Sequence, residues 1–513
     1  MNVLFVNPNS MTKNYQALAN KYAAIETPTW ALLLAESCRS KGFKVGILDA
    51  NAEGLNPEQS LKKINLLNPK FVCLVVYGQN VNAGTTNMVG AMELANYLKA
   101  NEPQFKIGLI GSHIQALPKE TMENEKSVDI GFINEGVYAL HNLLKLKDLS
   151  PPNLANINGI IYRDMNKIIF TKAEIVVPQN KMDEDLPGYA WDLLPFKNKP
   201  LDLYRAPLWH AEYQDKFRSP YAAIQTSIGC QFKCSFCMIN IINKNDNEET
   251  GIASNYSGMR FWSPNFIIKE FDKLFSLGVR TIKITDEMFL LNQKFYLPLC
   301  EMLAERNRDD KNKMWAYSRI DTVKNPEILS KVRKAGIKWL CLGIESGRKD
   351  IRLEVSKGKF EDVDVEKIVS QVEKSDINVM ANYIYGLPGD TKESIQHTFE
   401  LSKKLNTLGW NTYAAMALPG SQLYKEAVQN GTDLPKTYSE FSFHSYDTKP
   451  LPTKKLKAAE ILKIRDDHFH QYFSNINFQS KIRTKFGQTP VDNINDMLKV
   501  KLKRKIIEEE FKI

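Results

Sequence analysis

Residues 228–237 read Ile-Gly-Cys-Gln-Phe-Lys-Cys-Ser-Phe-Cys, and they place Cys230, Cys234 and Cys237 within one short loop. Cysteine thiolates are the ligands of iron–sulfur clusters, which normally take four of them. Three cysteines therefore predict a 4Fe-4S cluster whose fourth iron has no protein ligand and is open to a small molecule. The aromatic residue before the last cysteine, Phe236, is expected to shield this cluster from water.

A structural zinc site is the alternative for the same cysteines. Zinc would need a second pair of ligands at a comparable spacing. The sequence contains no second C-x2-C, and the H-x-H formed by His468 and His470 lies far along the chain. The pattern therefore favours the iron–sulfur cluster. The remaining cysteines lie in apolar stretches and are predicted to be buried thiols, namely Cys38, Cys73, Cys300 and Cys341.

Short β-rich runs and helical patterns alternate from the cysteine loop onward. The expected strands are 221–226, 281–285, 315–319, 339–344, 379–385 and 412–418. Helical patterns such as 263–275 and 326–334 lie between them. Six strands alternating with helices predict a partial (β/α)6 barrel of the TIM type, with its chemistry at the carboxyl ends of the strands.

The cysteine spacing, Phe236 and the polar strand ends resemble the radical S-adenosylmethionine (SAM) enzymes over about residues 221–425. The resemblance implies that the open iron binds the amino and carboxylate groups of SAM. It also implies further SAM contacts, for which the candidates here are Phe236, Asp286, Glu287, Ser318, Arg319, Glu345 and Gly386. Asp286 and Glu287 are expected to accept from the methionine ammonium, and Arg319 to bind the carboxylate. Glu345 is expected to accept from the ribose hydroxyls.

Residues 1 to about 150 show a second strand–helix alternation. The expected strands are 3–6, 44–48, 71–77, 106–110 and 128–132, with helices such as 29–40 and 87–98 between them. Five buried strands with helical crossovers predict a doubly wound, Rossmann-like α/β domain, whose ligand site lies beyond the carboxyl ends of the strands.

The loops at those ends resemble the cobalamin-binding domain that precedes the barrel in many radical SAM enzymes. The resemblance implies cobalamin contacts at Asp49, Asn51, Gly54, Gly78, Gln79, Gly111, Ser112, His113, Glu135 and Gly136. Cobalamin domains that coordinate cobalt use D-x-H-x-x-G, but this chain has Asn51 in the histidine position. Asparagine is a poor cobalt ligand beside imidazole. We therefore expect cobalamin to bind without a protein ligand below the metal; a domain that keeps the fold without the cofactor is the alternative.

Composition and charge are those of an ordinary globular protein. Of the 513 residues, 43% are hydrophobic and 25% charged, which excludes global disorder. No run approaches the length of a membrane span, and the amino terminus has no basic n-region, so we expect a cytoplasmic protein. The net charge of +9 comes partly from residues 499–505, which are followed by three glutamates. This mixed-sign pattern is typical of a solvated helix, so no nucleic-acid partner is expected.

Four segments are expected along the chain. They are a cobalamin-binding-like domain over 1–150, a linker with a β-hairpin over 151–220, the barrel over 221–428 and a helical carboxy-terminal region over 429–513. Aromatic residues 469, 472 and 473 in the last segment are expected to pack in a core.

The predicted function is that of a radical SAM enzyme that generates a 5′-deoxyadenosyl radical and methylates an unactivated carbon of a small-molecule or biosynthetic-intermediate substrate. An electron donor such as flavodoxin or ferredoxin would reduce the cluster. The alternatives are a cobalamin-associated cyclisation or rearrangement, a methylthiotransferase, and a non-enzymatic iron–sulfur regulatory module. The sequence assigns no catalytic residue.

Overall fold

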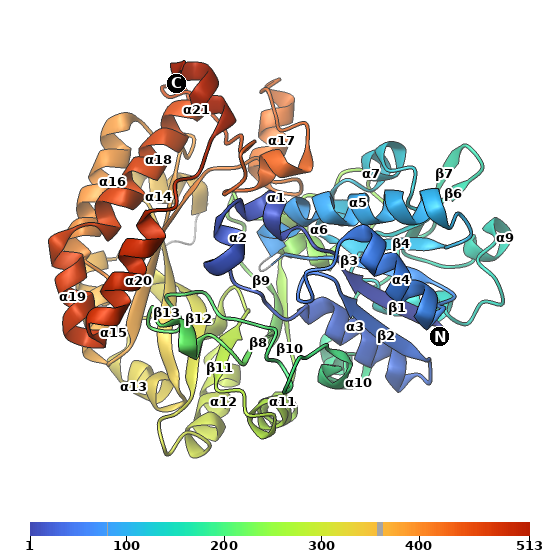
Figure 1. Cartoon of the computed structure of the whole chain (residues 1–513), viewed down its shortest axis with the longest axis horizontal. Coiled ribbons are helices and arrows are strands. Elements are labelled where there is room, and N and C mark those ends of the chain that lie inside the picture. The colour runs from blue at the N-terminus through green and yellow to red at the C-terminus, as the bar shows by residue number, and fades with distance from the viewer. Residues whose placement is uncertain (79–80, 357–362, 513) are drawn as a thin grey trace.

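The computed structural model describes residues 1–78, 81–356 and 363–512. Its strands form two large sheets and one small antiparallel pair, and helices cover both large sheets (Figure 1). Gln79, one of the expected cobalamin contacts, lies outside the described residues.

The first sheet has seven strands in the order β2-β1-β3-β4-β5-β6-β7. Its strands are β1 (Val3–Asn7), β2 (Val45–Asp49), β3 (Val72–Val76), β4 (Ile107–Gly111), β5 (Ile130–Phe132), β6 (Ile160–Asp164) and β7 (Lys167–Phe170). The first five are parallel, as expected for a doubly wound domain. The hairpin β6–β7, expected within the linker, instead pairs antiparallel with β5 and extends this sheet.

Alternation of side chains along β1 explains why helices cover both faces of this sheet. Val3 and Phe5 pack in the same core as α3 (Thr29–Ser40), whereas Leu4 and Val6 pack in the same core as α5 (Gly84–Asn101). Successive side chains of a strand point to opposite faces, so an unbroken apolar strand is buried on both.

The second sheet has six parallel strands in the order β15-β14-β13-β12-β11-β8. They are β8 (Tyr221–Ile224), β11 (Thr281–Ile284), β12 (Lys313–Arg319), β13 (Ile337–Glu345), β14 (Asn378–Tyr385) and β15 (Gly409–Ala414). This curled sheet is the expected partial barrel. The last strand was expected to continue to residue 418, but it ends at Ala414, and the backbone N–H of Ala415 donates to the carbonyl of Tyr385.

The helices in chain order are α1 (Met11–Tyr15), α2 (Leu18–Lys21), α3, α4 (Pro57–Leu67), α5, α6 (Ser112–Ala116), α7 (Pro118–Asn124), α8 (Val137–Leu143), α9 (Pro151–Leu154), α10 (Met182–Asp185), α11 (Pro264–Ser276), α12 (Gln293–Glu305), α13 (Pro326–Lys334), α14 (Lys349–Ser356), α15 (Val365–Lys374), α16 (Lys392–Leu405), α17 (Gln422–Gln429), α18 (Ala458–Phe473), α19 (Ile476–Phe486), α20 (Gln488–Leu498) and α21 (Lys505–Phe511). Within the described residues, no helix is long and apolar enough to cross a membrane.

The amino-terminal domain covers the open edge of the barrel. Thr27 Oγ1 accepts from the backbone N–H of Ala223 at 2.9 Å and donates to its carbonyl at 3.1 Å. Ile25 forms an isolated antiparallel bridge with Arg205. Because β8 is an edge strand, the two bonds of Thr27 occupy backbone groups of Ala223 that would otherwise be unpaired.

The carboxy-terminal helices close the opposite edge, and the aromatic stripe lies in their core. Tyr472 stacks on Trp410 of β15 with ring centroids 5.4 Å apart, and Phe473 packs edge-on against Tyr472. His468 stacks on Phe399 and shares a hydrogen bond with the hydroxyl of Tyr385.

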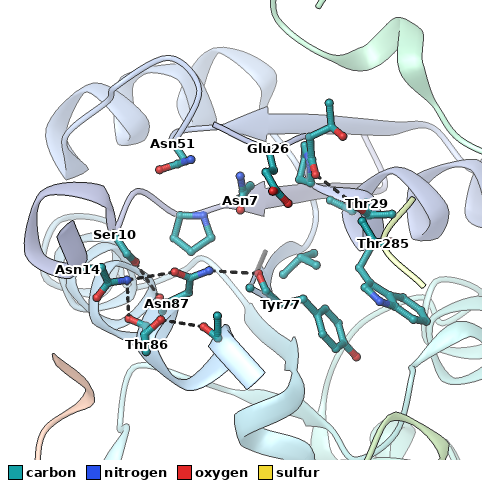
Figure 2. Close-up of a pocket in the computed structure, with 18 of the residues that line it drawn as sticks. Asn7, Ser10, Asn14, Glu26, Thr29, Asn51, Tyr77, Thr86, Asn87 and Thr285 are labelled. Atoms are coloured by element: carbon teal, nitrogen blue, oxygen red, sulfur yellow. Dashed lines mark hydrogen bonds between the residues drawn. The ribbon is translucent and has the colours of Figure 1, made fainter. Parts of the chain in front are cut away.

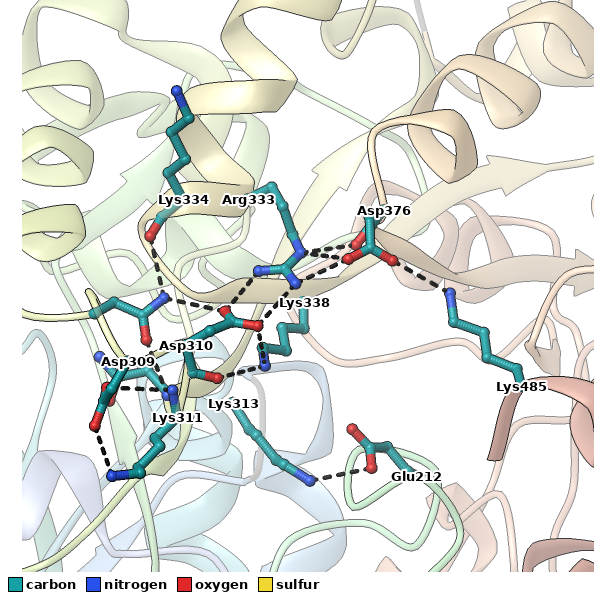
Figure 3. Close-up of polar contacts among 12 residues, drawn as sticks. Glu212, Asp309, Asp310, Lys311, Lys313, Arg333, Lys334, Lys338, Asp376 and Lys485 are labelled. Carbon is teal, nitrogen blue, oxygen red and sulfur yellow. Dashed lines mark hydrogen bonds and ion pairs between the residues drawn. The ribbon is translucent and has the colours of Figure 1, made fainter. Parts of the chain in front are cut away.

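An ion-pair network joins the amino-terminal ends of the barrel strands (Figure 3). The Arg333 guanidinium at the end of α13 lies 2.8 Å from Asp310 Oδ1 and 2.8 Å from Asp376 Oδ2. Lys338 of β13 also pairs with Asp310 at 3.1 Å. The arginine holds the pKa of Asp310 at about 2.

Candidate functional site

The three cysteines lie in one cavity of about 220 Å³, the cluster pocket, which is lined among others by Cys230, Cys234, Cys237, Glu287, Ser318, Arg319 and Glu345. Cys230 ends β9 (Ser227–Cys230), which pairs with β10 (Gly258–Phe261). Asn240 fixes the loop because its Oδ1 accepts from the N–H of Cys230 at 2.8 Å and its Nδ2 donates to the carbonyl of Phe232 at 3.0 Å.

Backbone N–H groups point at two of the sulfur atoms. The N–H of Phe232 donates to Cys230 Sγ at 3.4 Å, and the N–H of Ile239 donates to Cys237 Sγ at 3.5 Å. Hydrogen bonds of this kind stabilise ligating thiolates and tune iron–sulfur clusters. The donor set therefore fits a 4Fe-4S cluster, and Phe236 lies in the same pocket. In the described part of the chain, no group of three or more His, Cys, Asp or Glu side chains lies close enough together to hold a single metal ion.

Arg319, at the end of β12, is held in the cluster pocket from two sides. Its Nε and Nη2 each donate to a carboxylate oxygen of Asp321 at 2.6 Å. Its guanidinium lies 3.7 Å from the ring centroid of Phe232. The neighbouring Ser318 lines the pocket as well. Ion pairing and stacking together preset the position of this cation.

Two carboxyl groups face the cluster pocket with no hydrogen-bond partner among the described residues, those of Glu287 and Glu345. Burial raises the pKa of each to about 7, and Arg319 opposes this rise at Glu345. Glu345 also has a backbone φ of +64°, at a bulge in the pairing of β13 with β14. A left-handed φ at a non-glycine residue costs free energy and is concentrated at functional sites.

Asp286 has a different environment from its neighbour Glu287. Its carboxylate accepts from the N–H and hydroxyl of Thr226, at 2.6 and 2.7 Å, and from the hydroxyl of Ser227 at 2.5 Å. These three bonds occupy the carboxylate and tie β11 to the start of β9, which carries Cys230. The structure thus gives Asp286 a positioning contact with the cysteine loop rather than a place in the pocket lining.

Gly386 lies outside the cluster pocket. Its N–H donates to Asp390 Oδ2 at 2.9 Å, and a Cβ at this position would lie 2.9 Å from a side-chain atom of Ile461 in α18. Its φ of +80° also favours glycine. The residue allows a tight turn and close packing of α18, which the sequence did not reveal.

A second cavity, the sheet-edge cavity, opens at the carboxyl edge of the first sheet. Figure 2 shows polar side chains from helices and strand ends around it. Of the expected cobalamin contacts, Asn51 and Gly78 line it. Other lining residues were not expected from the sequence, among them Asn7, Ser10, Asn14, Trp30, Tyr77, Thr86 and Asn87. Their signal was weak because they come from α1, α3 and the start of α5 as well as from strand ends.

The amide groups in this cavity suit a ligand with many amide side chains, as cobalamin has. Asn14 Nδ2 donates to Asn87 Oδ1 and to the carbonyl of Thr86, both at 3.2 Å. Asn14 Oδ1 is buried without a hydrogen-bond partner. An unpaired buried acceptor is costly and marks a position for a donor. The lining therefore fits cobalamin, and no histidine or cysteine is among the described lining residues.

The remaining expected cobalamin residues have other neighbours. Asp49 bonds to Asn7 and Tyr204, His113 shares a hydrogen bond with Thr85, and Glu135 pairs with Arg260 at 2.7 Å. Burial lowers the pKa of His113 to about 4. Gly54, Gly111, Ser112 and Gly136 also lie outside the lining. A Cβ on Gly111 would lie 2.1 Å from the carbonyl oxygen of Val76, which explains that glycine by packing.

The two cavities meet at one side chain. Glu287 lines both the cluster pocket and the sheet-edge cavity. Glu287 follows β11 of the barrel, whereas most of the sheet-edge cavity belongs to the first domain. The tertiary structure thus brings the two candidate cofactor sites together.

Comparison with known families agrees with both sites. Residues 224–402 match the model of the radical SAM superfamily, and residues 15–144 match the B12 binding domain. The anaerobic magnesium-protoporphyrin IX monomethyl ester cyclase of Cereibacter sphaeroides is 23% identical over 92% of this chain and 70% of its own. An uncharacterised methyltransferase of Pyrococcus horikoshii is 23% identical over 81% of this chain and 82% of its own.

Solved structures share the fold. The cobalamin-dependent SAM radical enzyme OxsB, with aqua-cobalamin and SAM bound, aligns with a TM-score of 0.64 at 16% identity, over 97% of this chain and 72% of that one. The radical SAM methyltransferase TsrM from Kitasatospora setae, with cobalamin and a 4Fe-4S cluster bound, aligns with a TM-score of 0.60 at 16% identity, over 86% of this chain and 85% of that one. The chain therefore combines a B12-binding domain with a domain of the radical SAM superfamily.

Proposed function

We propose that this enzyme transfers a methyl group to an unactivated carbon of a small-molecule substrate. The observation that carries the proposal is the meeting of the cluster pocket and the sheet-edge cavity at Glu287. A substrate at this junction would lie beside both cofactor sites. Direct transfer of a methyl group from cobalamin to a substrate radical requires the substrate to lie close to both cofactors.

The residues divide the task between the two cavities. Cys230, Cys234 and Cys237 would hold the cluster, and Glu287, Ser318, Arg319 and Glu345 would hold SAM. The polar lining of the sheet-edge cavity, including Asn51 and Gly78, would hold cobalamin. When bound, the cluster and SAM supply a 5′-deoxyadenosyl radical that removes a substrate hydrogen atom, and cobalamin supplies the methyl group.

A cyclisation or rearrangement without methyl transfer is the second candidate. It is favoured by the relative from Cereibacter sphaeroides, named as a cyclase, which aligns with 92% of this chain. The same cofactor sites would serve both reactions, because both begin with removal of a hydrogen atom.

An experiment without a known substrate separates the two candidates. The protein is reconstituted anaerobically with iron, sulfide and hydroxocobalamin, reduced, and given SAM with a deuterated methyl group. The methyltransferase proposal expects both 5′-deoxyadenosine and cobalamin carrying the deuterated methyl, measured by mass spectrometry. 5′-Deoxyadenosine without labelled methylcobalamin would contradict methyl transfer and favour the cyclisation.

The control is the variant with alanine at Cys230, Cys234 and Cys237. It is expected to lose nearly all iron and all 5′-deoxyadenosine formation, because alanine offers no thiolate. A full cluster in this variant, by iron analysis and electron paramagnetic resonance, would overturn the assignment of the cluster ligands.

A further inference from the structure

A third cavity, the lumen cavity, lies inside the barrel and has a volume of about 230 Å³. It shares Tyr317, Cys341, Asn382 and Tyr413 with the cluster pocket. It also shares Glu26 with the sheet-edge cavity. A molecule in the lumen cavity therefore lies directly beside both candidate cofactor sites.

Aromatic rings form much of the wall. Trp209 packs edge-on against Trp315 with centroids 4.8 Å apart, and Trp315 packs edge-on against Tyr317 at 4.8 Å. Tyr413 lines the same cavity. Rings fixed by such contacts form a rigid apolar surface, and this surface suits a flat apolar ligand body.

The two charges in the lining neutralise each other. Lys283 Nζ of β11 lies 2.9 Å from Glu26 Oε2, and the two side chains are only 2% and 8% exposed. The Lys283 ammonium also lies 5.0 Å from the ring centroid of Trp315. The other polar residues lining the cavity are neutral asparagine, tyrosine, tryptophan and cysteine. A ligand with net charge would be desolvated here without a counter-ion, which is unfavourable.

The polar wall on β15, toward the other end of the strand order from the β11 ion pair, presents one acceptor and one donor without partners in the described part of the chain. Asn411 Nδ2 donates to Asn382 Oδ1 at 3.1 Å and to the hydroxyl of Tyr413 at 2.6 Å. This arrangement leaves Asn411 Oδ1 and the Tyr413 hydroxyl proton without partners among the described residues. A matching ligand edge must both donate and accept, as an amide does.

Resting on the proposed function, we infer that the lumen cavity binds the body of the substrate, and that this substrate is a small molecule without net charge that has a flat apolar part and an amide edge. Glu26 enters the barrel from the amino-terminal domain, so substrate recognition involves both domains. Asn411 and Tyr413 set the orientation of the amide edge.

Three probes of one shape test this inference on the reconstituted full-length protein: phenylacetamide, phenylacetate and phenethylammonium. Their binding is measured by saturation-transfer NMR titration. The inference expects phenylacetamide to bind at least about tenfold more tightly than either ion, since an uncompensated charge in a buried site costs more than this factor. Equal binding of all three probes, or tightest binding of an ion, would overturn it.

Two substitutions at Asn411 locate the probe. Asn411→Ala is expected to weaken phenylacetamide binding about tenfold, the size of one lost hydrogen-bonding group in a closed site, whereas Asn65→Ala on the exposed face of α4 leaves it unchanged. Asn411→Asp is expected to reverse the order, so that phenethylammonium binds best. Circular dichroism spectra and melting temperatures establish that each variant is folded, and a folded Asn411→Asp variant with the original order would contradict the site.

The result is separable from the test of methyl transfer. Probe binding is measured without turnover. Absence of labelled methylcobalamin would therefore contradict the methyltransferase proposal without affecting the assignment of the lumen cavity as a binding site. Labelled methylcobalamin together with equal binding of the three probes would contradict only the assignment of the lumen cavity.

Discussion

At the scale of single residues, the pair of Arg319 and Asp321 shows how the protein prepares a cation for an anionic group. Two charge-assisted bonds of 2.6 Å and the ring of Phe232 fix the guanidinium before any ligand arrives. Preset geometry reduces the entropy lost on binding.

Asp321→Asn is expected to weaken SAM binding about tenfold, because it removes one charge-assisted acceptor of Arg319. Iron content should not change, since Asp321 is not among the residues that line the cluster pocket. Equilibrium binding of SAM to the reconstituted variant measures the effect. Asp309→Asn, an exposed site, is the matched control. Wild-type affinity in Asp321→Asn would show that Arg319 needs no such support.

SAM binding should also depend on pH. Burial raises the pKa of Glu287 and of Glu345 to about 7, so each carboxyl is protonated below that value and ionised above it. The ionised form of Glu287 attracts the methionine ammonium, and the ionised form of Glu345 is the stronger acceptor for the ribose hydroxyls. The affinity for SAM should therefore fall about tenfold per pH unit below pH 7 where one of the two groups dominates binding. Titrations between pH 6 and pH 8 measure this. The double variant Glu287→Gln/Glu345→Gln should bind SAM weakly and with little pH dependence. An unchanged pH profile in that variant would exclude both carboxyl groups as the cause of the pH dependence.

The same raised pKa values affect stability without ligand. The folded state keeps these two protons to a higher pH than the unfolded state does. The contribution of these two carboxyl groups to the free energy of unfolding is therefore complete below their unfolded-state pKa near 4.5. It is lost as pH rises through about 7. A bound cation reverses this preference, because it stabilises the ionised form.

At the scale of elements, barrel strands need support at the end away from the chemistry. The network of Arg333, Asp310 and Asp376 joins the end of α13 to the turns that precede β12 and β14 (Figure 3). A substitution in this network should therefore change stability without changing catalysis.

Arg333→Met is expected to lower the free energy of unfolding by about 1 kcal/mol, because it breaks two ion pairs whose carboxylates are more than half exposed and thus screened. Denaturant titration measures the change. The matched control, Lys331→Met, removes one exposed pair with Glu301 and should leave the free energy of unfolding essentially unchanged. Loss of 5′-deoxyadenosine formation in a folded Arg333→Met variant would show that this end also affects the site.

The cysteine loop shows how much an element can be predicted. Its three candidate ligands and the aromatic residue expected to shield them follow from spacing alone, because they lie within one loop. The bonds that orient it come from Asn240 and Asp286, the latter 60 residues from Thr226. Such partners have no local signature, so the sequence alone predicts a SAM contact at Asp286 but not its bonds to Thr226 and Ser227.

At the scale of the whole molecule, the sheet-edge cavity is completed by the barrel through Gln225, Thr285 and Glu287. Cobalamin bound there would face barrel residues on one side and the first sheet on the other. The described lining offers amides and hydroxyls but no imidazole.

Cobalamin is therefore expected to bind with its lower base displaced and with no protein nitrogen on cobalt. Reduction of the protein reconstituted with hydroxocobalamin should give a base-off cob(II)alamin signal by electron paramagnetic resonance. Asn51→His is expected to introduce nitrogen splitting if residue 51 lies below the metal, because imidazole is the better ligand. Nitrogen splitting in the unaltered protein would contradict the assignment, and failure to retain cobalamin would leave the first domain without its cofactor.

The sequence by itself determined both domain types and predicted the three candidate cluster ligands, because apolar periodicity and cysteine spacing are local properties. Only the tertiary structure decided which polar residues share a cavity. Glu26 reaches Lys283 across 257 residues, and Thr27 reaches Ala223 across 196. The sequence predicts cobalamin contacts at His113 and Glu135, which follow strand ends. In the structure, His113 shares a hydrogen bond with Thr85, and Glu135 pairs with Arg260. Side-chain partners depend on how two sheets pack together, and that packing is set by contacts summed over the whole chain rather than by any one segment.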